Sequence, residues 1–235
     1  PTADFPAFED VDADGDLDIL AIQESGNKIY FYRNTSVELG FGRDSLLFQL
    51  EERCWGGIVE ADLGSDIFLS DEPGKCADEF FGNEEKEVLH AESAISVFDT
   101  DGDGDMDLFV GDTDYDRVSF FRNEKTDGFD WMNEFSIDFP REEESIQMDA
   151  FLLVQFVNID RDQENEMLVT PNQFLNAKNQ LPILSYDNTG VGKNPFELKS
   201  NNWLPNLSFD FGSESHPVFV DVNQDGLQDL LIGNY

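Results

Sequence analysis

A nine-residue acidic pattern recurs along this chain and constrains its fold more than any other feature. The pattern is Asp-x-Asp/Asn-x-Asp-Gly-x-x-Asp, and a short apolar run follows each copy. Well-formed copies begin at Asp10, Asp99 and Asp221, and a degenerate copy begins at Asn158. Several carboxylates this close in sequence repel one another unless a cation lies among them. The recurrence therefore predicts a repeat protein whose loops bind a hard cation.

The spacing within each copy suits calcium, which takes about six to eight oxygen ligands from carboxylates, carbonyls and water. Side chains at alternate positions can converge on one ion, and glycine at position 6 permits the sharp turn. Position 7 is expected to offer a backbone carbonyl, so even leucine can stand there. We expect calcium at three loops, with these ligands: Asp10, Asp12, Asp14, Asp16 and Asp18; Asp99, Asp101, Asp103, Asp105 and Asp107; Asp221, Asn223, Asp225, Leu227 and Asp229.

The degenerate copy departs from the pattern at two positions. Gln163 replaces the turn glycine, and Glu166 replaces the last aspartate. We expect at most a weaker fourth calcium site there, with these ligands: Asn158, Asp160, Asp162, Glu164 and Glu166.

An EF-hand is excluded, because that motif closes its loop with a glutamate at position 12. Position 12 here holds Ala21, Val110 and Ile232. The flanking apolar runs are short and rich in Ile, Leu and Val, which indicates strands rather than helices. The predicted strands are Leu17–Ile22, Met106–Val110 and Leu230–Ile232.

Self-similarity extends beyond the loops. Ile29–Asn34 matches Val118–Asn123, and each of these asparagines lies 24 residues after the first aspartate of its loop. Leu181–Asn188 is the same element in the third unit, delayed by a short insertion. A period this long, with several short strands per unit, is typical of radial β architectures.

These motifs resemble FG-GAP/VCBS repeats, the units of integrin-α-like β-propellers. The core Phe-x-Asp-x-Asp/Asn-x-Asp-Gly-x-x-Asp-Leu-Leu covers all four units. The resemblance implies an all-β fold, a β-propeller or propeller segment, in which each calcium loop joins two neighbouring strands of a blade. Cys54-Trp-Gly, His90-Ala-Glu-Ser and Gly233-Asn-Tyr also resemble segments of large secreted Bacteroidota proteins with a C-terminal sorting domain.

We expect a single β-propeller domain over residues 1–235, or part of a larger one, with units near 1–36, 90–125, 150–190 and 212–235. Residues 37–89 form an insertion that holds both cysteines, Cys54 and Cys76. Calcium loops favour an exported protein and hence a disulfide, the alternative being a free pair in a cytosolic protein. No signal peptide or sorting tail is evident, which suggests a piece of a longer polypeptide or a processed product.

The net charge of −37 argues against a nucleic-acid partner, because phosphate binding needs concentrated Lys and Arg. No apolar stretch approaches the length of a transmembrane span. Extracellular calcium is abundant enough to fill loops of modest affinity, so we expect a secreted or cell-surface protein.

No catalytic residues are predicted. The only histidines, His90 and His216, have no Ser or Cys partner in a nucleophile motif. Trp131 and Trp203 are expected to pack between blades, whereas Trp55, in the insertion, is the best candidate for a contact surface. Asn34 and Asn206 match the N-glycosylation pattern, which has a high false-positive rate.

Three functions remain open. The first is a calcium-binding extracellular module for adhesion or ligand binding, with a surface glycan or protein as ligand, or the rest of a longer chain as partner. The second is a module of a secreted polysaccharide lyase or hydrolase. The third is a passive spacer in a large surface protein. The fold alone cannot decide among them, although an enzyme is less favoured.

Overall fold

The computed structural model describes residues 4–23, 27–42, 45–60, 67–77, 93–113, 115–148, 151–172, 183–201, 203 and 216–233. Regular structure in these ranges is almost entirely β-strand, with short 3-10 turns such as η1 (Trp55–Gly57) and η3 (Glu142–Glu144). The expected all-β class is confirmed. His90, Asn206 and parts of the expected units and of the insertion lie outside the described residues.

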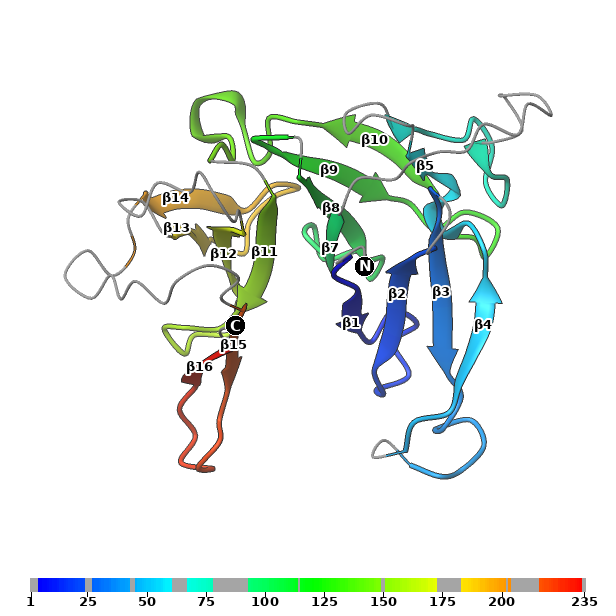
Figure 1. Ribbon diagram of the computed structural model, residues 1–235, viewed down its shortest axis with the longest axis horizontal. Helices are drawn as coiled ribbons and strands as arrows, with labels where there is room; N and C mark the ends of the chain where they lie inside the picture. Colours follow the sequence, from blue (N-terminus) through cyan, green and yellow to red (C-terminus); the bar gives the residue numbers. More distant parts are fainter. Residues whose placement is uncertain are drawn as a thin grey trace.

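Three antiparallel sheets each contain four strands in a simple up-and-down order (Figure 1). The strands are β1 (Ala7–Glu9), β2 (Asp18–Ile22), β3 (Ile29–Asn34) and β4 (Phe48–Glu52) in the first sheet; β7 (Ser93–Phe98), β8 (Asp107–Asp112), β9 (Val118–Asn123) and β10 (Met132–Ser136) in the second; and β11 (Leu152–Val157), β12 (Glu166–Pro171), β13 (Leu184–Asn188) and β14 (Phe196–Ser200) in the third.

Two smaller sheets complete the described structure. β15 (His216–Val220) and β16 (Asp229–Gly233) form a hairpin near the C-terminus, and β5 (Val59–Glu60) pairs with β6 (Ile67–Phe68). β4 lies within the range 37–89 and pairs with β3, so part of that range completes the first sheet. The several sheets are separate, and none closes on itself.

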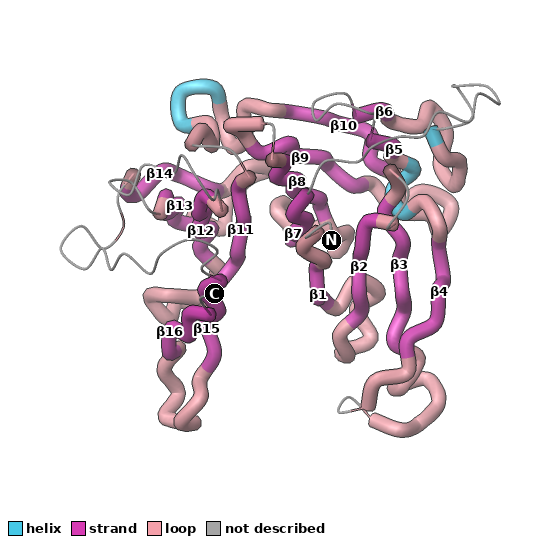
Figure 2. The backbone as a smooth tube through the Cα atoms, in the orientation of Figure 1, coloured by secondary structure: helices cyan, strands magenta, loops and turns pink. Residues whose placement is uncertain are grey.

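The first strands of the sheets lie side by side on the inner side of the fold, with later strands farther out (Figures 1 and 2). A parallel bridge joins Phe5 and Ala94, where Phe5 N–H donates to Ser93 O at 2.9 Å and Ile95 N–H donates to Phe5 O at 3.0 Å. Gly111 of β8 permits the next junction, because a Cβ there would lie 1.9 Å from the carbonyl oxygen of Leu152 in β11.

Burial follows from this arrangement. One hydrophobic core lies between the first and second sheets and another between the second and third, so every residue of β8 and β9 is buried. Among the described residues, the last hairpin is less well covered. Leu231 is 46% exposed, whereas the residues two places after the acid in the complete sheets are buried: Leu20 (0%), Phe109 (1%) and Leu168 (3%).

A disulfide joins Cys54 to Cys76, with Cα atoms 5.8 Å apart, as predicted. It holds a segment that packs Trp55 into the core between the first two sheets, beside Met132. Within the described ranges, the structure has no helix with the length and apolar character needed to cross a membrane.

Candidate metal centres and an adjoining cavity

Each of the four acidic loops connects the first two strands of its sheet, and these strand pairs all have the same register. The residue before the first acidic-pattern position pairs with the acid at position 9 in each case: Glu9 with Asp18, Phe98 with Asp107, Val157 with Glu166 and Val220 with Asp229. The loops, residues 10–17, 99–106, 158–165 and 221–228, are therefore structurally equivalent, and are called loops 1 to 4 below.

The acid at position 9 closes each loop by accepting a hydrogen bond from the backbone N–H at position 2. The four donors are Val11 (3.0 Å), Thr100 (3.1 Å), Ile159 (2.6 Å) and Val222 (3.1 Å). In loops 1 and 2 the second carboxylate oxygen accepts from the asparagine that ends the third strand. Asn34 N–H lies 2.7 Å from Asp18 Oδ1, and Asn123 N–H lies 2.8 Å from Asp107 Oδ1.

Positive φ angles occur at two positions of the loops. Position 6 has a glycine with φ of 96°, 96° and 84° in loops 1, 2 and 4, as the pattern predicts. Position 4 also has positive φ in every loop, at Ala13, Gly102, Arg161 and Gln224. The sequence did not reveal this second requirement, because only one of these residues is a glycine.

Loop 1 turns four carboxylate oxygens inward. Asp10 Oδ1, Asp14 Oδ2 and Asp16 Oδ1 are buried and make no hydrogen bond within the described residues, and Asp16 is only 2% exposed. The fourth oxygen, Asp12 Oδ2, is also buried but forms an ion pair with Arg33. Their other contacts orient them: Asp14 Oδ1 accepts from Asp16 N–H at 3.0 Å, and Asp16 Oδ2 accepts from Val37 N–H at 3.2 Å. Buried, unpaired carboxylate oxygens are costly unless a cation meets them.

Sequence reasoning missed one acid of this site. Carboxylate oxygens of Asp10, Asp12 and Asp18 lie within 4.8 Å of one another, and so do those of Asp12, Asp14 and Glu38. Glu38 lies outside the nine-residue pattern, in the turn after β3. Only the tertiary structure brings it to the loop.

Loop 2 gathers Asp99, Asp101 and Asp103 within the same 4.8 Å limit. Both oxygens of Asp99 already accept backbone hydrogen bonds, including one from Gly104 N–H at 2.9 Å. Asp105 N–H donates to Asp103 Oδ1 at 2.9 Å, and Asp105 Oδ2 accepts from Lys125 N–H at 2.6 Å.

The other two loops differ in how their acids meet. In loop 3, Asp160, Asp162 and Glu166 come together, and Glu164 N–H donates to Asp162 Oδ1 at 2.7 Å. Asn158 Oδ1 instead accepts from Arg161 N–H. In loop 4, Asp221 accepts from Gly226 N–H at 2.8 Å, and Asn223 and Asp225 cap the N–H groups of Asp225 and Leu227.

No three acids of loop 4 form such a cluster among the described residues, although Asp229 still closes that loop. Acidic clusters that could hold a metal ion are thus present in loops 1, 2 and 3.

The pKa values of several loop acids are raised, because burial disfavours their ionised forms. Burial raises the pKa of Asp18 to about 6, although the N–H groups of Asn34 and Val11 oppose this. Burial likewise raises the pKa of Asp107 to about 6, against hydrogen bonds from Thr100 and Asn123 and the charge of Arg122. Burial is also the first cause of the raised pKa of Asp16, with nearby carboxylates adding to it. A cation would favour the ionised forms.

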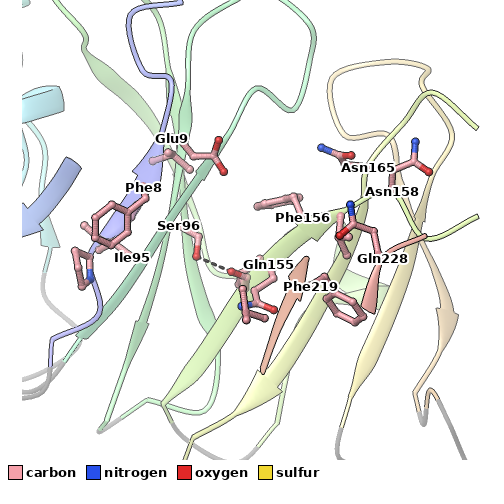
Figure 3. Close-up of a pocket in the computed structure, with 16 residues that line it drawn as sticks. Phe8, Glu9, Ile95, Ser96, Gln155, Phe156, Asn158, Asn165, Phe219 and Gln228 are labelled. Carbon is pink, nitrogen blue, oxygen red and sulfur yellow. Dashed lines mark hydrogen bonds between the residues drawn. The ribbon is translucent and has the colours of Figure 1, made fainter. Parts of the chain in front are cut away.

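A cavity of about 540 Å³ lies beside the loops, between the inner strands β1, β7, β11 and β15 (Figure 3). Phe8, Phe156 and Phe219 supply aromatic surface, and Figure 3 shows the side chains of Glu9, Asn165 and Gln228 around the same space. Within the described part of the chain, those three polar side chains make no hydrogen bond or ion pair. The cavity therefore presents these polar side chains next to aromatic rings.

The structure also shows the surroundings of three side chains that the sequence analysis singled out: Trp55, Asn34 and Trp131. Trp55 is fully buried and its indole N–H donates to Asp130 Oδ2 at 3.1 Å, so it cannot form the contact surface that the sequence suggested. Asn34 is also buried, with its amide donating to Ser45 O at 3.1 Å, which excludes glycosylation of the folded chain there. Trp131 is partly buried against the insertion, donating to Ser70 O at 2.9 Å.

Comparison with models of protein families found no match to this chain, and comparison with curated proteins found none either.

Proposed function

We propose that this chain is a calcium-stabilised β-propeller segment, of the FG-GAP/VCBS type, from a secreted or cell-surface protein. Calcium in the acidic loops would be structural rather than catalytic. Three four-stranded antiparallel sheets with adjacent inner strands support the propeller, and the disulfide supports an extracellular location.

The observation that carries the calcium proposal is the set of inward carboxylate oxygens in loop 1. Asp10, Asp14 and Asp16 each present one buried oxygen without a hydrogen-bond partner among the described residues, and Asp12 adds a buried oxygen that is paired with Arg33. A cluster of oxygen ligands alone, with no nitrogen or sulfur donor, suits a hard cation such as calcium. Magnesium demands a stricter octahedron and retains more water, so the crowded carboxylates favour calcium.

The cavity supports ligand binding as the wider role. Its volume lies in the range of small-molecule sites, and it combines aromatic rings with the amides of Asn165 and Gln228. Amides both donate and accept hydrogen bonds, as sugar hydroxyl groups require, and aromatic rings pack against the apolar face of a sugar. The net charge of −37 and the carboxylate of Glu9 disfavour anionic ligands. A neutral saccharide is the ligand that this chemistry favours.

The same lining gives less support to the other two functions. Most glycoside hydrolases need two carboxyl groups across the scissile bond. Glu9 is the single acid among the described residues that line the cavity, and no histidine, lysine or arginine lines it there. A passive spacer would need no such cavity.

Thermal unfolding with calcium in excess, compared with chelator, tests the structural role. Calcium at about 100 times its dissociation constant adds about 2.7 kcal/mol per site, so we expect a clear rise in Tm. Asp14→Asn keeps the oxygen that caps Asp16 N–H but removes the charge, and should reduce this rise. Asp127→Asn removes a carboxylate from an exposed turn outside the nine-residue pattern and is the matched control. An equal Tm with calcium and with chelator would contradict a structural role for calcium.

Ligand binding needs its own test. We expect the calcium-loaded protein to bind neutral glycans on an array that also displays acidic ones. Gln228→Leu should abolish this binding without changing Tm, because Gln228 is exposed and its side chain has no partner within the described residues. Binding confined to acidic glycans, or binding unaffected by Gln228→Leu, would contradict the assignment to this cavity.

A further inference from the structure

The side chain of Arg122 lies between loop 2 and the third sheet and contacts both. It stands in β9, is 5% exposed, and its guanidinium lies 5.0 Å from the ring centroid of Phe120. A buried arginine needs several partners to offset the loss of water. The partners of Arg122 belong to two different sheets.

One terminal nitrogen of Arg122 faces loop 2. This nitrogen (Nη1) donates to Thr100 Oγ1 at 2.8 Å and to Asp107 Oδ2 at 3.0 Å, and it lies 3.1 Å from Asp101 Oδ2. Asp101 is also a member of the acidic cluster with Asp99 and Asp103. Asp101 is therefore shared between the guanidinium and any cation held by that cluster.

The other terminal nitrogen faces the third sheet. This nitrogen (Nη2) donates to the carbonyl oxygen of Lys193 at 2.8 Å and to Asn194 Oδ1 at 2.7 Å. Both acceptors lie in the turn between β13 and β14. One planar side chain thus connects an acidic loop of the second sheet to a turn of the third.

The positions equivalent to Arg122 in the first and third sheets also form ion pairs. Arg33, which precedes the asparagine of β3, makes ion pairs with Asp12 of loop 1 and with Glu38. In β13 the aligned residue is Asp187, and Lys199 of β14 lies 2.5 Å from it. The pKa of Lys199 is raised, first by the hydrogen bond to Asp187 and further by the charges of Asp160 and Glu166 of the loop 3 cluster.

We propose that Arg122 is a positioning residue, the built-in counter-cation of loop 2, which links cation binding in that loop to the junction between the second and third sheets. The proposal rests on the calcium role proposed above. In metal-free protein Arg122 offsets carboxylate repulsion. When calcium binds, the two cations share Asp101 and repel each other, so Arg122 weakens calcium binding while it transmits binding to the third sheet.

Calcium titration followed by NMR of backbone amides can separate these effects. Gly104 N–H, 2.9 Å from Asp99 Oδ2, reports on loop 2, and Gly192, beside Lys193, reports on the third sheet. Gly226 of loop 4 is an internal control in the same spectra. In wild-type protein we expect Gly104 and Gly192 to shift with one dissociation constant.

Arg122→Gln removes the charge and the bridge. We expect its Gly104 dissociation constant to fall about tenfold, because a positive charge beside the ion is lost. The part of its Gly192 response that follows the Gly104 dissociation constant should disappear, its Gly226 titration should stay unchanged, and its Tm in chelator should drop. Loss of a merely structural residue would weaken calcium binding rather than strengthen it.

Arg122→Lys retains the charge but not the fork that reaches two sheets. It should keep the Gly104 dissociation constant within about twofold of wild type and lose the Gly192 response. Arg122→Lys also keeps the test possible if Arg122→Gln does not fold in chelator. The proposal would be overturned if the Gly104 dissociation constant of Arg122→Gln stayed the same or rose. It would also be overturned if that constant fell about tenfold in Arg122→Lys, which keeps the charge. If no loop glycine of wild-type protein responds to calcium, the proposed function itself fails, and this inference with it.

Discussion

The backbone N–H of Asn123 donates to Oδ1 of Asp107 at 2.8 Å, and this bond ties the end of β9 to the start of β8. The other oxygen of Asp107 accepts from Thr100 and Arg122. The pattern marks Asp107 as a calcium ligand, yet both of its oxygens already have partners in the fold. Its role in the protein is therefore structural even without metal.

Asp107→Ala should lower the free energy of unfolding in chelator by about 3 kcal/mol, because it leaves Arg122 and two backbone N–H groups short of a buried partner. Urea unfolding measures the loss. Asp103→Ala is the matched change in the same loop, since Asp103 is exposed and, among the described residues, its side chain caps Asp105 N–H alone. It should cost under about 1 kcal/mol in chelator. Equal costs for the two variants would contradict the structural assignment.

The loops should fill with calcium in a definite order. Loop 1 presents buried oxygens without hydrogen-bond partners, whereas the first aspartates of loops 2 and 4 accept hydrogen bonds from Gly104 and Gly226. Calcium must compete with those bonds. In an NMR titration we expect Gly15 of loop 1 to shift at lower calcium than Gly104 or Gly226. A titration in which Gly226 responds first would refute this order.

Position 4 of the loops should respond to substitution in opposite directions. Ala13 has a φ of 61°, where its Cβ is strained, so Ala13→Gly should stabilise the protein in chelator by about 1 kcal/mol. The equivalent Gly102→Ala should destabilise it by a similar amount. A Cβ at Gly102 meets no atom within 4 Å, so only backbone strain is introduced. Paired urea unfolding curves check both changes, and changes of the same sign would rule out the strain argument.

Glu52 should make stability depend on pH. Burial raises its pKa from 4.5 to about 7, with the charges of Asp130 and Glu51 adding to the effect. Because the folded value exceeds the unfolded one, the stabilisation from protonated Glu52 is full below pH 4.5 and is lost as pH rises through about 7. The side chain is partly exposed, so solvent screening reduces the effect to roughly 1–2 kcal/mol.

Glu52→Gln should therefore stabilise the protein at about pH 8 and have little effect at about pH 4.5, as measured by urea unfolding at both values. Glu143→Gln, an exposed glutamate in η3, is the control and should behave alike at both pH values. The interpretation fails if Glu52→Gln gives the same change in free energy at the two values.

Local sequence was enough to predict the strands that carry the loops. β3 and β9 coincide with the repeated segments Ile29–Asn34 and Val118–Asn123, and β2 and β8 begin at the acid in position 9. A nine-residue loop determines its own register, because the side chains that close it lie within it. The disulfide was also predictable, as the chain has just two cysteines.

Other features required the tertiary structure. Glu38 reaches loop 1 from the turn after β3, and no spacing in the sequence marks it. Arg122 stands at the same position of the repeated segment as Arg33, but only the packing of the sheets shows which groups it pairs with. Trp55 looked like a surface residue because the insertion has little core of its own. The structure buries it between two sheets, since the disulfide-linked segment packs on Met132 rather than standing free.

The sequence by itself determined the repeat, the acidic loops, the all-β class and the cysteine pair, because each depends on residues close together or on composition. The tertiary structure decided which carboxylates meet, which are already satisfied by backbone N–H groups, and which cation offsets the charge. Those outcomes depend on how separate sheets pack, and a buried charge is sensitive to every group within a few ångströms, however distant that group is along the chain.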